Sequence, residues 1–288
     1  DRDSDSDSDT SQHTGSDSDI DDDDQSTTDD AAAVVERRSK FMSLLERINE
    51  LPLRTRNKLD ALVEGNLDDT QADIYDMLCD NDGENYQGLD SNRDTEAEVE
   101  TAIRLFPDVL SEPDVNGIYP IQRLYALRAD IHFKCNVKGV SFIHLLARLA
   151  IEFRCFEEHE RGGLLIQDHR NDNVLQSLMY NSFTNFGVEH NQLVDTSFLR
   201  ELLQLRRMSL FIQGDICEYD LLPIACQGGH FNEHRVRFLV EWDPMSLKKR
   251  DEDNRWTALH YAANVFPTHE GFPIVFEYYL RYFPNKSG

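Results

Sequence analysis

Apolar positions recur at helical spacing through much of the chain after residue 30. Over 31–50, the residues that follow this spacing are Val34, Val35, Phe41, Leu44, Leu45 and Ile48. The pattern predicts a helix that ends at Leu51 and Pro52, because proline lacks the amide that would continue the helix. This helix is either a partner-binding or coiled-coil segment or a cap on the domain that follows, and we favour the cap.

Two shorter helices are predicted next, over 55–64 and 70–79, with Gly65 ending the first. Residues 80–94 are polar and contain glycine, which is typical of a linker. We therefore expect a short helical segment over 31–79, a linker over 80–94 and a separate domain over 95–288.

Within that domain, three segments share one shape, at 102–110, 238–247 and 279–285. Each is an apolar helix that ends close to an aromatic residue and a proline. Since proline stops the helix, these segments are predicted to be the outer helices of an irregular repeat.

Inner helices are predicted to begin at Tyr119, Ser141, Asn173, Asp220 and Thr257. All but the tyrosine suit the N-cap, because a short side-chain oxygen accepts a hydrogen bond from a first-turn amide. Two residues earlier, the turn requires a positive φ, which glycine adopts freely and which costs other residues about 1 kcal/mol. The residues at these turn positions are Gly117, Gly139, Asn171, Glu218 and Arg255. Small residues that allow close helix packing follow at Ala147, Ala225, Ala262 and Ala263.

The strongest of these sites is 257–263, Thr-Ala-Leu-His-Tyr-Ala-Ala, a sequence typical of an ankyrin repeat. The histidine of such a repeat bonds the capping hydroxyl and nearby backbone. We therefore expect His260, and His144 in the corresponding place after Ser141, to be structural rather than catalytic. The sequence predicts an all-α fold, in which a degenerate ankyrin-like helical solenoid follows a disordered acidic tail.

Three further stretches carry a resemblance: Gln-Gly-Leu-Asp-Ser-Asn at 87–92, 153–173 with Arg-Gly-Gly-Leu-Leu at 161–165, and 238–242. With them, roughly residues 70–288 resemble a large family of ankyrin-like proteins that is abundant in diatoms and has no assigned function. The resemblance implies an ankyrin-like fold with a further repeat after the last segment. Since the sequence stops at Gly288, the resemblance implies either a fragment with truncated repeats or a naturally short member with an exposed apolar end.

Charge separates the tail from the rest of the chain. The net charge is −25, and residues 1–30 hold 13 Asp and one Arg with almost no apolar side chain. Such a segment buries too little apolar surface to offset its ordering entropy, so we expect it to be disordered. Repeated Ser-Asp units make Ser4, Ser6, Ser16 and Ser18 candidate phosphorylation sites, and the alternative is a solubilising tail without a partner.

Candidate chemistry is sparse. Cys226, His230 and His234 are four residues apart and would share a helix face suitable for zinc, but two glycines interrupt that face and no fourth ligand is evident. We therefore expect one core cysteine, two surface histidines and no metal. The chain has no phosphate-binding loop, serine elbow or H-E-x-x-H motif, so we expect neither an enzyme nor a cofactor.

The charge, apolar runs and cysteines of the chain limit which partners and compartments it suits. Outside the tail, 54 − 13 = 41 acidic residues outnumber 29 − 1 = 28 basic ones, which disfavours direct nucleic-acid binding. No apolar run reaches the roughly 18 residues of a membrane span. The five cysteines include no C-x-x-C pair, and no leader is visible, so we expect an intracellular protein, cytoplasmic or nuclear.

The expected function is a non-catalytic protein–protein interaction scaffold, because stacked repeats present an extended binding surface to a protein partner. The alternative is an acidic-tail chaperone for histones or other polycations, with the repeats as a docking module. Salt separates the two, since binding through the tail would collapse at high ionic strength.

Overall fold

The computed structural model describes residues 53–82, 85–129, 132–180, 187–227, 231–251, 254–264 and 271–284. The chain divides into two units, residues 1–65 and 66–288, and the description below concerns the second. The predicted acidic tail with its candidate phosphorylation sites, and the predicted helix over 31–50, lie outside the described residues.

The described part is helical, with one small sheet. Its first helix, α2 (Leu53–Cys79), includes Gly65, so the predicted break between two helices at that residue is wrong. A single glycine inside a helix costs only about 1 kcal/mol relative to alanine, which a long helix tolerates. The all-α prediction also misses a hairpin in which β1 (Ala126–Ala129) pairs antiparallel with β2 (His132–Cys135), placing Ala126 opposite Cys135.

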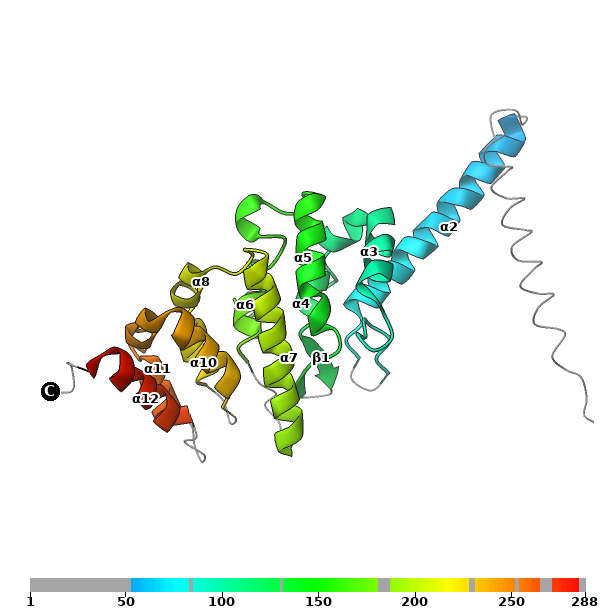
Figure 1. Ribbon diagram of the computed structural model, residues 1–288. Helices are drawn as coiled ribbons and strands as arrows, with labels where there is room; N and C mark the ends of the chain where they lie inside the picture. Colours follow the sequence, from blue (N-terminus) through cyan, green and yellow to red (C-terminus); the bar gives the residue numbers. More distant parts are fainter. Residues whose placement is uncertain are drawn as a thin grey trace, which may run out of the picture. The chain divides into compact units, whose positions relative to one another are not determined.

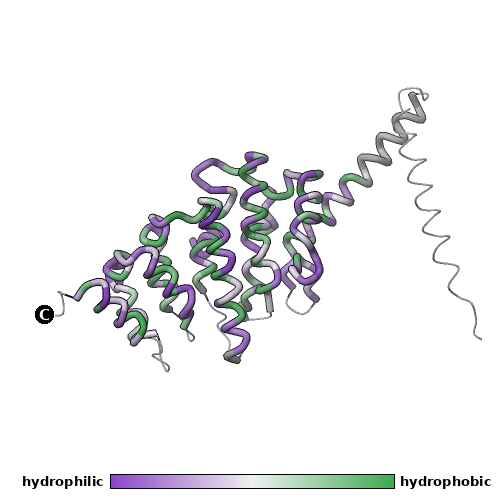
Figure 2. The backbone as a smooth tube through the Cα atoms, viewed as in Figure 1, coloured by the Kyte–Doolittle hydropathy of each residue, from purple (hydrophilic) through white to green (hydrophobic). Residues whose placement is uncertain are grey.

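Five helices form one row in chain order, which we call the long-helix row (Figure 1). They are α3 (Glu96–Leu105), α5 (Ile143–Glu152), α7 (Gly187–Arg207), α10 (Glu233–Trp242) and α12 (Gly271–Tyr282). Each contacts the next along the row. Their amphipathic sequences, visible as alternating colours in Figure 2, bury one face of each helix in a shared core.

Four shorter helices lie against this row and form the short-helix row. They are α4 (Pro120–Arg123), α6 (Val174–Ser177), α9 (Leu221–Ala225) and α11 (Ala258–Asn264). Here α6 contacts α9, and α9 contacts α11. The remaining helical turns are η2 (Pro107–Ser111), η3 (Val140–Phe142), η4 (Glu158–Glu160), α8 (Gln213–Glu218) and η5 (Pro244–Lys248).

Prolines end three long-row helices as the sequence predicts. Helix α3 ends two residues before Pro107, α10 two residues before Pro244, and α12 two residues before Pro284. Pro107 and Pro244 then begin the short turns η2 and η5, where a missing amide costs nothing.

The predicted linker over 80–94 is instead packed against the domain. Leu89 is fully buried in the core. Tyr86 donates a hydrogen bond to the Leu89 carbonyl at 2.6 Å and accepts one from Asn136 at 3.0 Å. The ammonium of Lys138 lies 2.7 Å from Asp90. The polar composition of this segment is therefore used in hydrogen bonds, and its one buried leucine anchors it.

Candidate binding site

Three loops that precede short-row helices are built around an aspartate. In the first, the Asp114 carboxylate accepts hydrogen bonds from the amides of Asn116 (2.8 Å) and Ile118 (2.9 Å). The Asp114 amide in turn donates to the Ile118 carbonyl at 2.9 Å. Between them, Gly117 has a φ of +75°, as its turn position predicts. An Asp side chain suits this position because it bonds backbone amides a few residues ahead.

The same geometry recurs at Asp168, and a version that is one residue longer occurs at Asp251. Asp168 accepts from the amides of Arg170 (2.8 Å) and Asp172 (3.1 Å), and Asn171 has a φ of +64°. Asp251 accepts from the amides of Asn254 (2.6 Å) and Arg255 (3.2 Å), and Arg255 has a φ of +59°. The positive φ predicted for Asn171 and Arg255 is therefore confirmed.

A side chain in the first helical turn then closes each loop. The Tyr119 amide donates to Gln122 at 2.9 Å, and the Asn173 amide donates to Gln176 at 2.9 Å. The two glutamines also link neighbouring loops. Gln122 Nε2 donates to the Ile166 carbonyl at 3.0 Å, and Gln176 Nε2 donates to the Tyr219 carbonyl at 3.3 Å. The second loop is thus fixed both by its own aspartate and by the helix of the first loop, and Gln176 extends the same kind of link to the turn before α9.

In the third loop, His260 takes the place of the glutamine. Its Nδ1 lies 2.8 Å from the Thr257 hydroxyl and accepts from the Thr257 amide at 3.2 Å. The prediction that His260 bonds the hydroxyl and nearby backbone is confirmed. The stacked Trp256 ring lies 6.4 Å from the imidazole.

His144 does not follow this pattern, so the expected bond to a capping hydroxyl is wrong. It lies in α5 of the long-helix row, and its amide and Nδ1 both contact the carboxylate of Glu201 on α7, at 2.6 and 3.1 Å. The Ser141 hydroxyl bonds the Lys138 carbonyl instead. Glu201 is 57 residues away, so no local sequence signal identifies it as the partner.

Two turn positions also differ from the prediction. Gly139 has a φ of −76°, and its role is close approach: a Cβ there would lie 2.6 Å from Asn136 Nδ2. Glu218 is the last residue of α8, so the positive φ predicted there is wrong; a φ of +50° falls two residues later, at Asp220. Asp220 precedes α9 without a side-chain capping bond.

The predicted close packing of the small residues agrees with burial at three positions and is wrong at one. Ala262 is 1% exposed, and Ala147 and Ala225 are fully buried, as expected for close helix packing. Ala263 is exposed, so its predicted place against a neighbouring helix is wrong. Helix α11 ends one residue later, and its buried face runs through Ala258 and Ala262, four residues apart.

The three residues whose spacing was considered for zinc are not brought together among the described residues. Cys226 is buried, and burial raises the pKa of its thiol to about 12, which disfavours the thiolate that binds metal. The His234 imidazole pairs with Asp195 at 2.9 Å, and His230 lies outside the described residues. No group of three His, Cys, Asp or Glu side chains in the described part is arranged to hold a metal ion.

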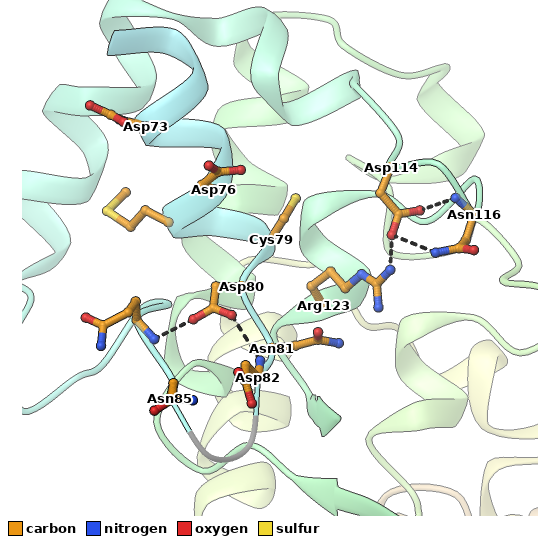
Figure 3. Close-up of a pocket in the computed structure, with 12 residues that line it drawn as sticks. Asp73, Asp76, Cys79, Asp80, Asn81, Asp82, Asn85, Asp114, Asn116 and Arg123 are labelled. Carbon is orange, nitrogen blue, oxygen red and sulfur yellow. Dashed lines mark hydrogen bonds and ion pairs between the residues drawn. The ribbon is translucent and has the colours of Figure 1, made fainter. Parts of the chain in front are cut away.

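A cavity of about 1060 Å³ lies beside the first aspartate-centred loop (Figure 3). Asp73 and Asp76 reach it from α2, and Asp80, Asp82 and Asp114 line it from the loops. Arg123 is the only cation of its lining and is paired with Asp114. Because five aspartates and one arginine line it, we call it the acidic cavity.

Its carboxylates differ in their partners. Asp80 accepts from the amides of Asp82, at 3.0 Å, and of Gln87, which holds the loop in place. Asp73 and Asp76 are exposed on α2. Cys79, also in the lining, is partly buried, and burial raises the pKa of its thiol to about 11, so it stays neutral near pH 7. The cavity therefore offers negative charge, without an activated nucleophile at Cys79.

The cavity is not evident in the sequence, because its residues are divided between a predicted helix, a predicted linker and a turn. The signal was present as the acidic residues of 73–82, which follow helical spacing at 73, 76 and 80. This spacing does not reveal Asp114, which lies in the loop after η2 and joins the cavity only in the folded chain.

Comparisons with protein-family models, with curated proteins and with solved structures gave no significant match. Among the described helices, none has the length and apolar composition that a membrane span requires.

Proposed function

We propose that this protein is a non-catalytic protein-binding scaffold of degenerate ankyrin-like repeats, and that its acidic cavity receives a basic segment of the partner. Support for the repeats comes from the three aspartate-centred loops, each with a positive φ before a short helix. The two glutamine links between loops, and the two rows of helices, agree with a solenoid related to the family that the sequence resembles.

The acidic cavity is the observation that carries the binding proposal. A volume of about 1060 Å³ accommodates several side chains of a peptide, and the exposed Asp73 and Asp76 are part of its lining, whereas backbone amides occupy Asp80. Guanidinium and ammonium groups complement such carboxylates and gain charge-assisted hydrogen bonds. A lysine- and arginine-containing protein segment fits this chemistry better than an anionic ligand does.

A matched pair of variants tests the proposal. Fluorescence anisotropy would follow a labelled nine-residue Lys/Arg peptide binding to the full chain. We expect the double variant Asp73→Asn/Asp76→Asn to weaken binding about tenfold, the scale of losing one charge-assisted contact worth about 1.4 kcal/mol. Asp68→Asn/Asp69→Asn removes the same charge from exposed positions of α2 outside the cavity. Equal weakening by both pairs would show that only overall charge matters and would refute the cavity as the site.

A further inference from the structure

Helix α7 stabilises the starts of both of its neighbours in the long-helix row with a carboxylate. Glu201 accepts from the amide of His144, the second residue of α5, and also contacts that histidine's Nδ1. Asp195 accepts from the amide of His234, the second residue of α10, at 2.8 Å, and contacts its Nδ1 at 2.9 Å. A carboxylate placed there satisfies an orphan amide and complements the positive end of the helix dipole.

The two sites share this geometry but differ in what neutralises the carboxylate. Asp195 pairs with the guanidinium of Arg235 at 2.8 Å, and Arg235 is fully buried. Arginine keeps its charge at every accessible pH. The imidazole of His234 is half exposed, so Asp195 does not depend on it for compensation.

No arginine in the part of the chain that the structure describes forms an ion pair of this kind with Glu201. Glu201 is 3% exposed, and its recorded ion-pair partner among the described residues is His144, whose Nδ1 is 3.1 Å from both carboxylate oxygens. On the other side of the ring, Nε2 lies 3.6 Å from Glu96 at the start of α3. The imidazole therefore sits between carboxylates from α3 and α7, and it is itself 8% exposed.

The elements η2, η3 and α4 also pack against α5, and none of their described residues forms an ion pair with His144. On α5 itself, Arg148 pairs with Glu100 at 2.7 Å and Glu152 lies one turn beyond. Glu96 and Glu201 are thus the two groups that set the charge state of the imidazole.

We propose that protonated His144 holds α3, α5 and α7 together through its ion pairs, and that loss of its proton loosens this part of the long-helix row. Protonated, the imidazolium neutralises Glu201 and attracts Glu96. Without the proton, a buried carboxylate loses its counter-charge, which is strongly unfavourable in a poorly solvated site. Burial raises the pKa of Glu201 for the same reason, so both members of the pair favour keeping the proton. Burial alone would lower the pKa of His144, but Glu201 and Glu96 outweigh it and raise that pKa above its ordinary value.

The sign of the effect follows from this shift. A histidine with a raised folded-state pKa stabilises the protein fully below its unfolded pKa of about 6.5, and that stability is lost as the pH rises through the folded-state value. We therefore expect α3 and the start of α5 to exchange amide protons faster as the pH rises through this range, after correction for intrinsic exchange. The start of α10, with Arg235 in place, provides the internal reference.

The experiment measures the His144 imidazole pKa by NMR in the full chain, together with the denaturant midpoint from about pH 6 to 9. We expect a pKa above 6.5 and a midpoint that falls with pH. Glu201→Gln keeps an oxygen for the His144 amide but removes the charge, so the fall should disappear. Glu189→Gln, an exposed position on α7, should keep the fall unchanged.

A second variant keeps the test decisive if Glu201→Gln does not fold. Glu96 is 62% exposed, so Glu96→Gln should fold and should shift the His144 pKa downward. A His144 pKa at or below 6.5 in the unaltered chain, or one that Glu96→Gln leaves in place, overturns the proposal. So does a Glu201→Gln variant with the same pH profile as the unaltered chain.

Discussion

At the residue scale, glycine serves two different needs in this protein. At Gly117, a Cβ would meet nothing within 4 Å, so only the positive φ of +75° favours glycine. At Gly162, in the Arg-Gly-Gly stretch, φ is +68° and a Cβ would also lie 2.2 Å from the Ala147 carbonyl oxygen. The turn at Gly162 therefore lies directly on the backbone of α5.

These two glycines give a first prediction. Gly117→Ala should lower the free energy of unfolding by about 1 kcal/mol through backbone strain alone. Gly162→Ala adds a steric conflict with backbone that cannot move aside, so we expect a loss of about 3 kcal/mol. Urea unfolding of both variants measures the difference. Equal losses would mean that the chain around residue 162 adjusts freely.

At the element scale, the buried face of α11 is narrow. Ala258 and Ala262 are buried against α9, α12 and η5, whereas Ala263 is exposed although the sequence places it in the same motif. The motif identifies the helix and its start, but the boundary of the buried stripe depends on where the neighbouring helices cross it.

A second prediction tests that boundary. Ala262→Leu inserts methylenes into a filled interface and should lower the free energy of unfolding by about 1–3 kcal/mol. Ala263→Leu makes the same change one residue away, on the exposed side, and should stay within about 0.5 kcal/mol of the unaltered protein. Thermal or urea unfolding compares them. A larger loss for Ala263→Leu would place α11 in a different rotation.

The same contrast explains what the sequence could predict. Features set by near neighbours were predictable: helix ends at Pro107 and Pro244, the positive φ at Gly117, and the Thr257–His260 bond. Features set by distant residues were not. The partner of His144 lies 57 residues away on α7, and Tyr86, which donates to the Leu89 carbonyl, accepts from Asn136, 50 residues away. The acidic cavity was missed for this reason, since Asp114 joins it from outside the acidic stretch.

At the scale of the whole molecule, the two carboxylates of α7 limit stability at opposite ends of the pH range. Burial alone would raise the pKa of Asp195, but Arg235 and the hydrogen bonds around it outweigh burial and hold the pKa below its usual value. Such a group stabilises the protein above its unfolded pKa of about 3.9, and that stability is lost as the pH falls through the folded-state value. The His144 site has the opposite dependence.

We therefore predict that the free energy of unfolding passes through a maximum between these limits. Asp195→Asn should lower it by about 3 kcal/mol near pH 6, because the buried Arg235 loses its counter-charge, and should flatten the acid limb of the profile. Chemical denaturation across pH, for this variant and the unaltered chain, provides the measurement. If the stability of Asp195→Asn falls as steeply at low pH as that of the unaltered chain, other carboxylates are responsible for the acid limb.

The links between neighbouring loops also bear on how the chain folds while it is being synthesised. The bonds of Gln122, Gln176 and His144 reach partners 44, 43 and 57 residues later in the chain. At synthesis rates of about 5–20 residues per second, each partner emerges within roughly ten seconds of the residue that needs it. These three side chains can therefore find their hydrogen-bond partners soon after they are synthesised. They do not depend on the C-terminal end of the polypeptide.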